Sequence, residues 1–268
     1  MKKILKKTAE KFGYNINKIL KEEVPQPQKS KYLVSIENDI GYYETPIGNY
    51  YLPNNAPDDE IFNYMKEGKI FEPYVIETAK MFIKEGSTVL DVGSNFGQMT
   101  IIFSKLVGDN GIVYAFEADD FVFEILKKNI EANNCKNVIP IFGAVYNESG
   151  KELIFPKQDF QTFKAYGSYG INPSAINGRI VKSVKMDDIN FEKPISFMKI
   201  DIQGSDLFAL QGAKQTIRKF KMPILFEYEQ QFQPQFNTSF QDYVDFINEI
   251  DYRFDEIIKE INYLVKPK

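Results

Sequence analysis

The sequence predicts an α/β protein built on a doubly wound, mostly parallel sheet. From residue 87 onward, short apolar runs alternate with longer segments of helical periodicity, which is the pattern of successive βαβ units. A parallel sheet of this kind is covered by helices on both faces. The chain has 268 residues, of which 43% are hydrophobic and 26% are charged, as expected for one large globular domain with an appendage.

The elements of this sheet follow one another along the chain. Five strands are expected at 87–92, 112–117, 138–142, 195–201 and 224–229. Helices are expected at 96–107, 119–134, 206–220 and 240–250. An antiparallel pair at 253–258 and 263–266 would bring the sheet to seven strands. The irregular stretch 143–194 contains an expected hairpin at 145–155 and a loop rich in Gly, Ser and Asn.

The chain divides into three expected segments. Residues 1–30 are interpreted as a basic amphipathic helix with a proline-punctuated linker, residues 31–84 as an N-terminal cap, and residues 85–268 as the main domain. Within the cap, two aromatic runs around a Pro/Gly turn predict a hairpin at 41–52. Helices at 58–66 and 72–84 are expected to lead into the first central strand.

Charge is distributed unevenly along the chain. Residues 1–21 carry seven Lys and one Glu, whereas the remainder carries 26 basic and 36 acidic residues. An acidic body argues against a nucleic-acid partner, which needs a broad basic surface. Residues 1–21 lack the apolar core of a signal peptide, so they are expected to lie on an anionic membrane surface, or to dock on the body or a second subunit. We expect a cytoplasmic protein, with peripheral association at the inner membrane surface as the alternative.

The chain contains no His and one Cys, Cys135. This composition excludes Ser-His-Asp and Cys-His catalysis, His-ligated zinc, an internal disulfide and any CxxC motif, and it favours a reducing compartment. Acid-base chemistry must therefore come from Asp, Glu, Lys, Tyr or Cys.

Polar residues follow the expected strands where a ligand of such a sheet would bind. The first strand ends in Asp91 and a turn with Gly93 and Gly97, and the second ends in Glu117. The glycine spacing is neither G-x-G-x-x-G nor that of a phosphate loop, so a nucleoside without a diphosphate fits better than NAD or ATP. S-adenosylmethionine is such a ligand. Asp91 could instead cap the turn, and Glu117 could be an exposed strand-end carboxylate.

Three blocks of sequence resemble the FkbM family of S-adenosylmethionine-dependent methyltransferases, which have a Rossmann-like class I sheet. The blocks are VLDVGSNFG at 89–97, FEAD at 116–119 with Asn129 and Asn133, and FMKIDIQGSD at 197–206 followed by LQGA at 210–213. Gln203 and Asp206 stand where the family usually has Glu, and Ala118 replaces a usual Pro. The resemblance implies that the cofactor is bound by Glu72, Asp91, Gly93, Ser94, Asn95, Gly97, Gln98, Glu117, Ala118, Gly143, Ala144 and Asp201.

The resemblance also implies methylation of a sugar hydroxyl in a glycan, polysaccharide or glycosylated metabolite. A hydroxyl must lose its proton, so a base or a metal should be close. Asp201 is the first candidate base; Lys199 could orient it or, if desolvated, act as a base itself, and Glu227 is the third candidate. Mg²⁺ bound by Asp201, Glu227 and Glu229 is a less favoured alternative. Candidate substrate residues are Ser168, Tyr169, Gln203 and Tyr228.

Several interpretations stay open at this point. The loop at 166–174 suits a lid that stacks on sugar faces and equally suits an ordinary surface loop. Lys199 and Asp201 could form a purely structural buried pair. The alternatives to sugar O-methylation are N-methylation or small-molecule O-methylation, a non-catalytic protein that kept the fold, and an NAD-dependent reductase.

Overall fold

The computed structural model describes residues 30–157 and 164–268, and residues 32–268 form one compact unit. The predicted helix at 1–21 lies outside the described residues, so its role stays a prediction, as does the cap boundary at residue 84. Within the described part of the chain, no helix is both long enough and apolar enough to span a membrane.

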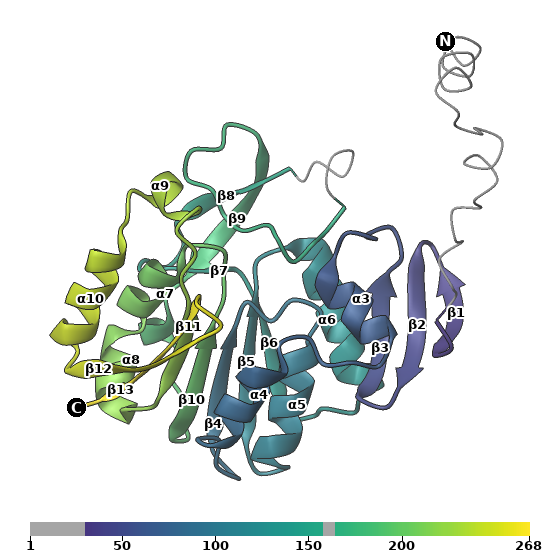
Figure 1. Cartoon of the computed structure of the whole chain (residues 1–268), viewed down its shortest axis with the longest axis horizontal. Coiled ribbons are helices and arrows are strands. Elements are labelled where there is room, and N and C mark those ends of the chain that lie inside the picture. Colours follow the sequence, from purple (N-terminus) through teal and green to yellow (C-terminus); the bar gives the residue numbers. More distant parts are fainter. Residues whose placement is uncertain (1–29, 158–163) are drawn as a thin grey trace, which may run out of the picture. The chain divides into compact units, whose positions relative to one another are not determined.

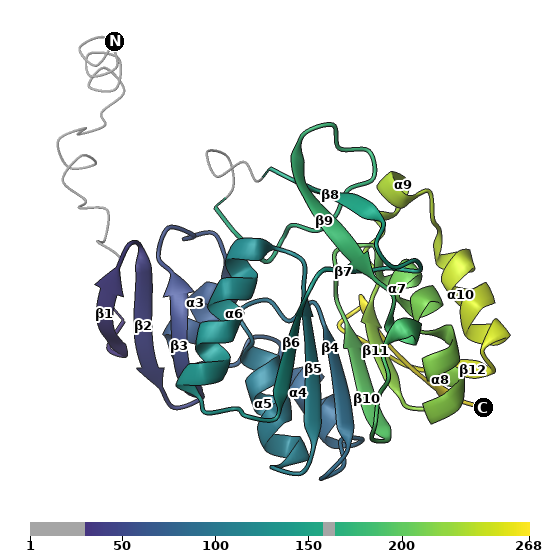
Figure 2. The same cartoon turned by 180° about the vertical axis from the view of Figure 1, so that it is seen from behind.

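A seven-stranded sheet forms the centre of the compact unit, as predicted (Figures 1 and 2). Its parallel strands are β4 (Thr88–Val92), β5 (Ile112–Glu117), β6 (Val138–Phe142), β10 (Ile195–Ile200) and β11 (Ile224–Glu227). The predicted terminal pair, β12 (Tyr252–Ile258) and β13 (Asn262–Pro267), is antiparallel and completes the order β12-β13-β11-β10-β4-β5-β6. The chain runs outward from β4 to β6 and resumes at β10 on the other side of β4. The topological switch point therefore lies between β4 and β10, where ligands bind in such sheets.

Helices cover both faces of the sheet because apolar residues of the strands alternate between two cores. Val89, Val113 and Phe197 pack with the face formed by α4 (Pro73–Lys80), α5 (Gln98–Val107) and α6 (Asp120–Ala132). Leu90, Met198 and their neighbours pack against α7 (Asp206–Gly212), α8 (Lys214–Phe220) and α10 (Phe240–Glu249).

The cap contains the predicted hairpin, β2 (Ile40–Thr45) and β3 (Gly48–Pro53), together with an unpredicted edge strand β1 (Leu33–Glu37) and the helix α3 (Glu60–Lys66). Asn129 of α6 and Asn133, the residue that caps its C-terminus, dock β3. Asn129 exchanges hydrogen bonds with the backbone of Tyr51, and Asn133 does so with Asn49. Asn129 also donates to the carbonyl of Phe96 at 2.8 Å, so it links the cap to the turn after β4.

The predicted hairpin at 145–155 is wrong. β7 (Ala144–Val145) and β8 (Glu152–Pro156) both pair with β9 (Gly178–Val184), a strand that was not predicted. The short helices η1 (Met186–Asp188) and α9 (Gln233–Phe236) were also missed.

The single helix predicted at 206–220 is wrong as well, because it is divided into α7 and α8. A Cβ on Gly212 would lie 2.1 Å from the carbonyl oxygen of Tyr146, so the backbone is packed tightly at the break. The Asp187 carboxylate accepts from the amides of Gln215 and Thr216 at 3.0 and 2.8 Å, which gives α8 its own N-terminal cap.

Candidate active site

The turn after β4 requires glycine at both predicted positions. Gly93 has a φ of 82°, and a Cβ there would lie 1.9 Å from the carbonyl oxygen of Asp201. Gly97 has a φ of 86°, and its Cβ would lie 2.6 Å from Leu126 Cδ1. The amides of Gly93 and Ser94 both donate to the carbonyl of Phe116 on β5. The turn is therefore fixed between β5 and β10, with its backbone exposed to the space above the sheet.

Glu117 ends β5 beside this turn. Its carboxylate accepts from the amide of Asn95 at 2.9 Å and from those of Ala118 and Asp119 at 2.7 and 2.8 Å. Burial raises the pKa of Glu117 to about 7, although the three amide hydrogen bonds oppose the rise. Glu117 is thus an oriented acid at the edge of the cavity rather than an exposed strand end.

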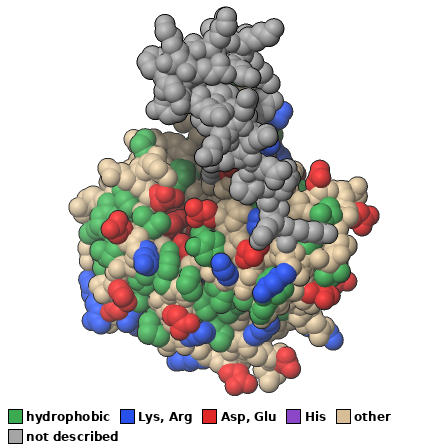
Figure 3. Space-filling view, turned by 45° about the vertical axis from the view of Figure 1, so that its right-hand side comes forward, with side chains coloured by type: hydrophobic (Ala, Val, Ile, Leu, Met, Phe, Trp, Pro, Cys, Tyr) green, Lys and Arg blue, Asp and Glu red, His purple; other side chains and the backbone are tan. Residues whose placement is uncertain are grey.

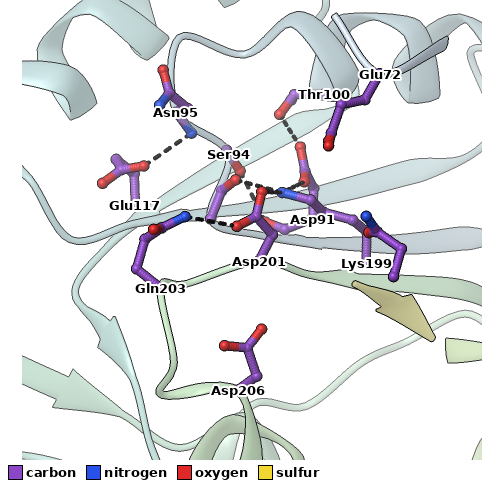
Figure 4. A network of polar contacts seen from close by, with 12 residues as sticks. Glu72, Asp91, Ser94, Asn95, Thr100, Glu117, Lys199, Asp201, Gln203 and Asp206 are labelled. Atoms are coloured by element: carbon purple, nitrogen blue, oxygen red, sulfur yellow. Dashed lines mark hydrogen bonds and ion pairs between the residues drawn. The ribbon is translucent and has the colours of Figure 1, made fainter. Parts of the chain in front are cut away.

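Lys199 connects the turn to two carboxylates (Figure 4). It lies opposite Asp91 in the parallel register of β10 and β4. Its Nζ donates to the carbonyl of Gly93 at 2.9 Å and lies 3.2 Å from Asp201 Oδ2 and 4.0 Å from Asp91 Oδ1. Burial alone would lower the pKa of Lys199, but Asp201, Asp91 and Glu72 raise it above its ordinary value. These three carboxylates stabilise the protonated ammonium, so the arrangement favours Lys199 as an orienting group over Lys199 as a base.

Asp91 is fully buried and lies behind the turn, not in the cavity lining. The Thr100 hydroxyl donates to Oδ2, while Oδ1 has no hydrogen-bond partner among the described residues. Burial raises the pKa of Asp91, and the nearby Lys199 opposes that rise. In the structure Asp91 therefore supports Lys199 from outside the cavity lining.

Asp201 follows β10 at the switch point, and Gln203 Nε2 donates to its Oδ1 at 3.2 Å. Although burial raises the pKa of Asp201, Lys199 and a hydrogen bond with Glu227 bring it below its ordinary value. Burial and the charge of Asp201 raise the pKa of Glu227 strongly. The two carboxyl groups therefore titrate as a pair, and the opposite directions of their pKa shifts favour Asp201 as the ionised member.

A cavity of about 100 Å³ lies above these groups. Its lining contains thirteen of the predicted site residues: Glu72, Gly93, Ser94, Asn95, Gln98, Glu117, Ala118, Gly143, Ala144, Tyr169, Lys199, Asp201 and Gln203. Five predicted residues are outside the lining, namely Asp91, Gly97, Ser168, Glu227 and Tyr228. Tyr228 instead packs against the rings of Phe240, Tyr243 and Tyr263.

Two predicted residues join the cap to the cavity. Gln98 accepts from the amide of Phe71 at 2.8 Å and donates to the carbonyl of Lys69 at 3.1 Å. Glu72 has a φ of 49°, an uncommon conformation for a non-glycine residue, and accepts from the hydroxyl of Tyr74. Burial raises the pKa of Glu72.

Sequence reasoning missed part of the cavity lining, including Ile61 and Phe71 of the cap, Phe155 of β8, and Tyr166, Gly167, Gly170 and Ile171 of the loop above the sheet. The glycine-rich composition of that loop pointed to a lid, but of its residues in the lining only Tyr169 was among the predicted site residues. Ile61, Phe71 and Phe155 carry no local signal, since only the tertiary fold brings them there. Within residues 30–157 and 164–268, no group of three or more His, Cys, Asp or Glu side chains is arranged to hold a metal ion.

The fold and the site together define a class of protein. Numbered along the chain, the sheet has the order 3-2-1-4-5-7-6, with the seventh strand antiparallel, which is the class I methyltransferase arrangement. Residues 91–254 match the model of the methyltransferase FkbM domain family. The chain belongs to this family, so the predicted family and enzyme class are confirmed.

Individual relatives resemble the chain only in part. It is 35% identical over 104 residues to a cobalt-precorrin-6B C(15)-methyltransferase of Sulfolobus acidocaldarius, covering 36% of this chain and 53% of that protein. It is 34% identical over 102 residues to the ribosomal protein L11 methyltransferase of Acetivibrio thermocellus, covering 35% and 32%. The chain therefore spans about half the length, or less, of these curated relatives.

A solved FkbM methyltransferase from Methylobacillus flagellatus KT matches 76% of this chain and 52% of its own, with 16% identity and a TM-score of 0.44. The precorrin-6y C5,15-methyltransferase of Geobacter metallireducens GS-15 matches 71% and 83%, with 12% identity and a TM-score of 0.42.

Proposed function

We propose that this chain transfers a methyl group from S-adenosylmethionine to a sugar hydroxyl of a glycan, polysaccharide or glycosylated metabolite. Family membership supports the reaction class. The observation that carries the acceptor class is the pair formed by the Asp201 carboxylate and the Gln203 amide in the cavity lining. Such a pair both accepts and donates hydrogen bonds, which suits neighbouring sugar hydroxyls, and the ring of Tyr169 offers an apolar face nearby.

The cavity residues fit the methyl donor. Gly93, Ser94 and Asn95 of the turn line the cavity, so their backbone can approach the aminocarboxypropyl end, with Glu72 near the amino group. Glu117 would accept from the ribose hydroxyls, and Ala118, Gly143 and Ala144 would flank the adenine. The acidic lining suits a ligand with an ammonium and a sulfonium group. When bound, S-adenosylmethionine supplies an electrophilic methyl group.

Asp201 would orient the acceptor hydroxyl and receive its proton. Because its pKa is lowered, Asp201 is a weak base toward a free alcohol. The O–H group of the acceptor becomes strongly acidic only as its oxygen bonds to the methyl carbon. The species formed in that step is a protonated ether, which is a far stronger acid than any carboxylic acid. Proton transfer to Asp201 is thus favourable late in the reaction. Alignment of the hydroxyl can supply about 7–11 kcal/mol of the barrier reduction.

The test is a methyl-transfer screen with labelled S-adenosylmethionine against nucleotide sugars and oligosaccharides, with and without EDTA to reveal any Mg²⁺ dependence. Asp201→Asn should reduce transfer about 10²–10⁴-fold, the usual contribution of a proton acceptor. Asp242→Asn, at the exposed start of α10, is the matched control and should retain activity. Full activity of Asp201→Asn on a sugar would show that Asp201 is not the acceptor of the proton.

One observation favours a second candidate, N-methylation. The lowered pKa of Asp201 matters less for an amine acceptor, because a neutral amine attacks through its lone pair and lessens the need for a base. In that case amines and not sugars would be labelled in the screen, and Asp201→Asn would cost little activity. Calorimetry with S-adenosylmethionine separates a non-catalytic protein from both candidates, since failure to bind the methyl donor would rule out either transfer reaction.

A nucleic-acid acceptor is not part of the proposal. On the described residues visible in Figure 3, Lys and Arg side chains are interspersed with acidic and hydrophobic ones and form no continuous basic patch. Binding of labelled RNA at low salt would contradict this view.

A further inference from the structure

Asp59 of the cap is a buried carboxylate, 1% exposed, and among the described residues it accepts hydrogen bonds from three backbone amides. Its Oδ1 accepts from the amide of Phe62 at 2.9 Å and so caps α3. Its Oδ2 accepts from the amides of Tyr166 and Gly167 at 2.7 and 3.1 Å, which lie more than 100 positions further along the chain. One oxygen therefore serves the helix, and the other holds the loop above the sheet.

That loop, residues 164–171, is called the roof segment here. Tyr166, Gly167, Tyr169, Gly170 and Ile171 all line the cavity. At its start, the amide of Lys164 donates to the carboxylate of Asp58, the neighbour of Asp59, at 2.8 Å. The amide of Asp58 in turn donates to the carbonyl of Lys164 at 3.2 Å. The roof segment is thus attached to the cap and not only to the sheet.

The roof segment fits closely at both ends. A Cβ on Gly167 would lie 2.8 Å from Ile61 Cδ1 of the cap and 3.2 Å from Asn95 Nδ2 of the glycine turn. A Cβ on Gly170 would lie 2.9 Å from Gln203 Cβ. Tyr166 stacks on Phe121 with ring centroids 5.0 Å apart and meets the edge of Phe96 at 6.1 Å. The end held by Asp59 therefore lies over the turn, where the cofactor is expected.

We propose that Asp59 is a positioning residue that holds the roof segment over the cavity in the arrangement that binds S-adenosylmethionine. The inference rests on the proposed cofactor and adds that the N-terminal cap is part of the binding site. Without the two amide contacts at Oδ2, the roof segment must be ordered again each time the cofactor binds, at a cost in affinity.

The test compares S-adenosylhomocysteine binding by calorimetry in the unaltered protein and in Asp59→Ser. A serine hydroxyl still caps α3 through the Phe62 amide but is too short to hold Tyr166 and Gly167 as well. We expect the Kd to rise about tenfold, as for loss of hydrogen bonds to a charged group. Amide exchange at Tyr166 and Gly167 in the complex should also become faster. If Asp59→Ser does not fold, Asp59→Asn replaces it, because its single carbonyl oxygen cannot serve both sets of amides.

Ser239→Ala is the control, since it removes the capping box of α10, an exposed helix end outside the cavity lining. It should lower stability and leave the Kd unchanged. An equal rise in Kd for both variants, or an unchanged Kd and unchanged exchange for Asp59→Ser, would overturn the inference alone. Failure of the unaltered protein to bind S-adenosylhomocysteine would overturn the proposed function and the inference with it.

Discussion

Replacement of Lys199 by Met tests whether the site depends on one buried cation. The methionine keeps the volume of the side chain but removes the donor to the Gly93 carbonyl at 2.9 Å and the partner of Asp201 at 3.2 Å. Asp91, which is fully buried 4.0 Å away, would lose its nearest cation as well. Removing one partner of a buried pair costs about 3–5 kcal/mol, because the remaining charge stays desolvated. We expect Lys199→Met to lose about that much unfolding free energy at pH 7.

The pH dependence follows from the direction of each shift. Lys199 has a raised pKa, so its contribution is complete below the ordinary lysine value and is lost only as the pH rises through the folded value. Asp201 has a lowered pKa, so its contribution is complete above the ordinary aspartate value and is lost as the pH falls through the folded value. The unaltered protein therefore keeps both contributions between pH 5 and 8. In the variant, Asp91 and Asp201 take up protons on folding, so the deficit should shrink toward pH 5.

Urea titrations at pH 8 and pH 5 measure both effects. Lys214→Met, which removes a solvated ion pair with Glu249, is the control and should change stability little at either pH. The double variant Lys199→Met with Asp201→Asn should recover part of the lost unfolding free energy, because only Asp91 then remains as a buried carboxylate without its cation. A deficit below about 1 kcal/mol, or one that grows toward pH 5, would refute the reasoning.

Three further predictions concern single residues of the site. Gly93→Ala should abolish S-adenosylhomocysteine binding in calorimetry and lower the Tm, because its Cβ would overlap the Asp201 carbonyl at 1.9 Å in a left-handed conformation. In the unaltered protein, S-adenosylhomocysteine binding should weaken as the pH falls through about 7, because Glu117 becomes protonated there and loses acceptors for the ribose. Glu117→Gln should bind S-adenosylhomocysteine with a higher Kd that does not depend on pH. Glu227→Gln should change unfolding free energy by less than about 1 kcal/mol at pH 7 in urea titrations, since Glu227 is already neutral and an amide can still donate to Asp201.

The sheet and the part of the cavity lining that comes from the strand ends could be predicted because their signals are local. Buried strands are short apolar runs, and Gly93 and Glu117 sit at strand ends within 25 positions of each other. Strand pairings between segments that are distant along the chain have no such local signal in the sequence. β8 pairs with β9, and a Cβ on Gly178 would lie 2.3 Å from the carbonyl oxygen of Phe155. No turn signal in 145–155 could predict this close approach of the two backbones.

The role of Asp91 shows the same limit at the level of one side chain. Its place at the end of a strand predicted a cofactor contact, but the register of β4 with β10 sets it opposite Lys199. Strand order is decided by the crossover from β6 to β10, so the neighbour of Asp91 cannot be read from residues near it. The hydrogen bond from the Tyr166 amide to Asp59 could not be predicted either, because the two residues lie far apart in the sequence.

The departure from the family pattern at position 203 has a physical reason in this site. Asp201 already raises the pKa of two buried neighbours, Asp206 and Glu227, whose burial is the larger cause. A glutamate at 203 would add another acidic group where Gln203 now donates to Asp201 Oδ1 at 3.2 Å. Lys199 and Glu227 lower the pKa of Asp201, and the donor amide of Gln203 adds to their effect. In the proposed reaction, Gln203 therefore adds to Lys199 and Glu227 in keeping Asp201 ionised, whereas a glutamate at this position would oppose them.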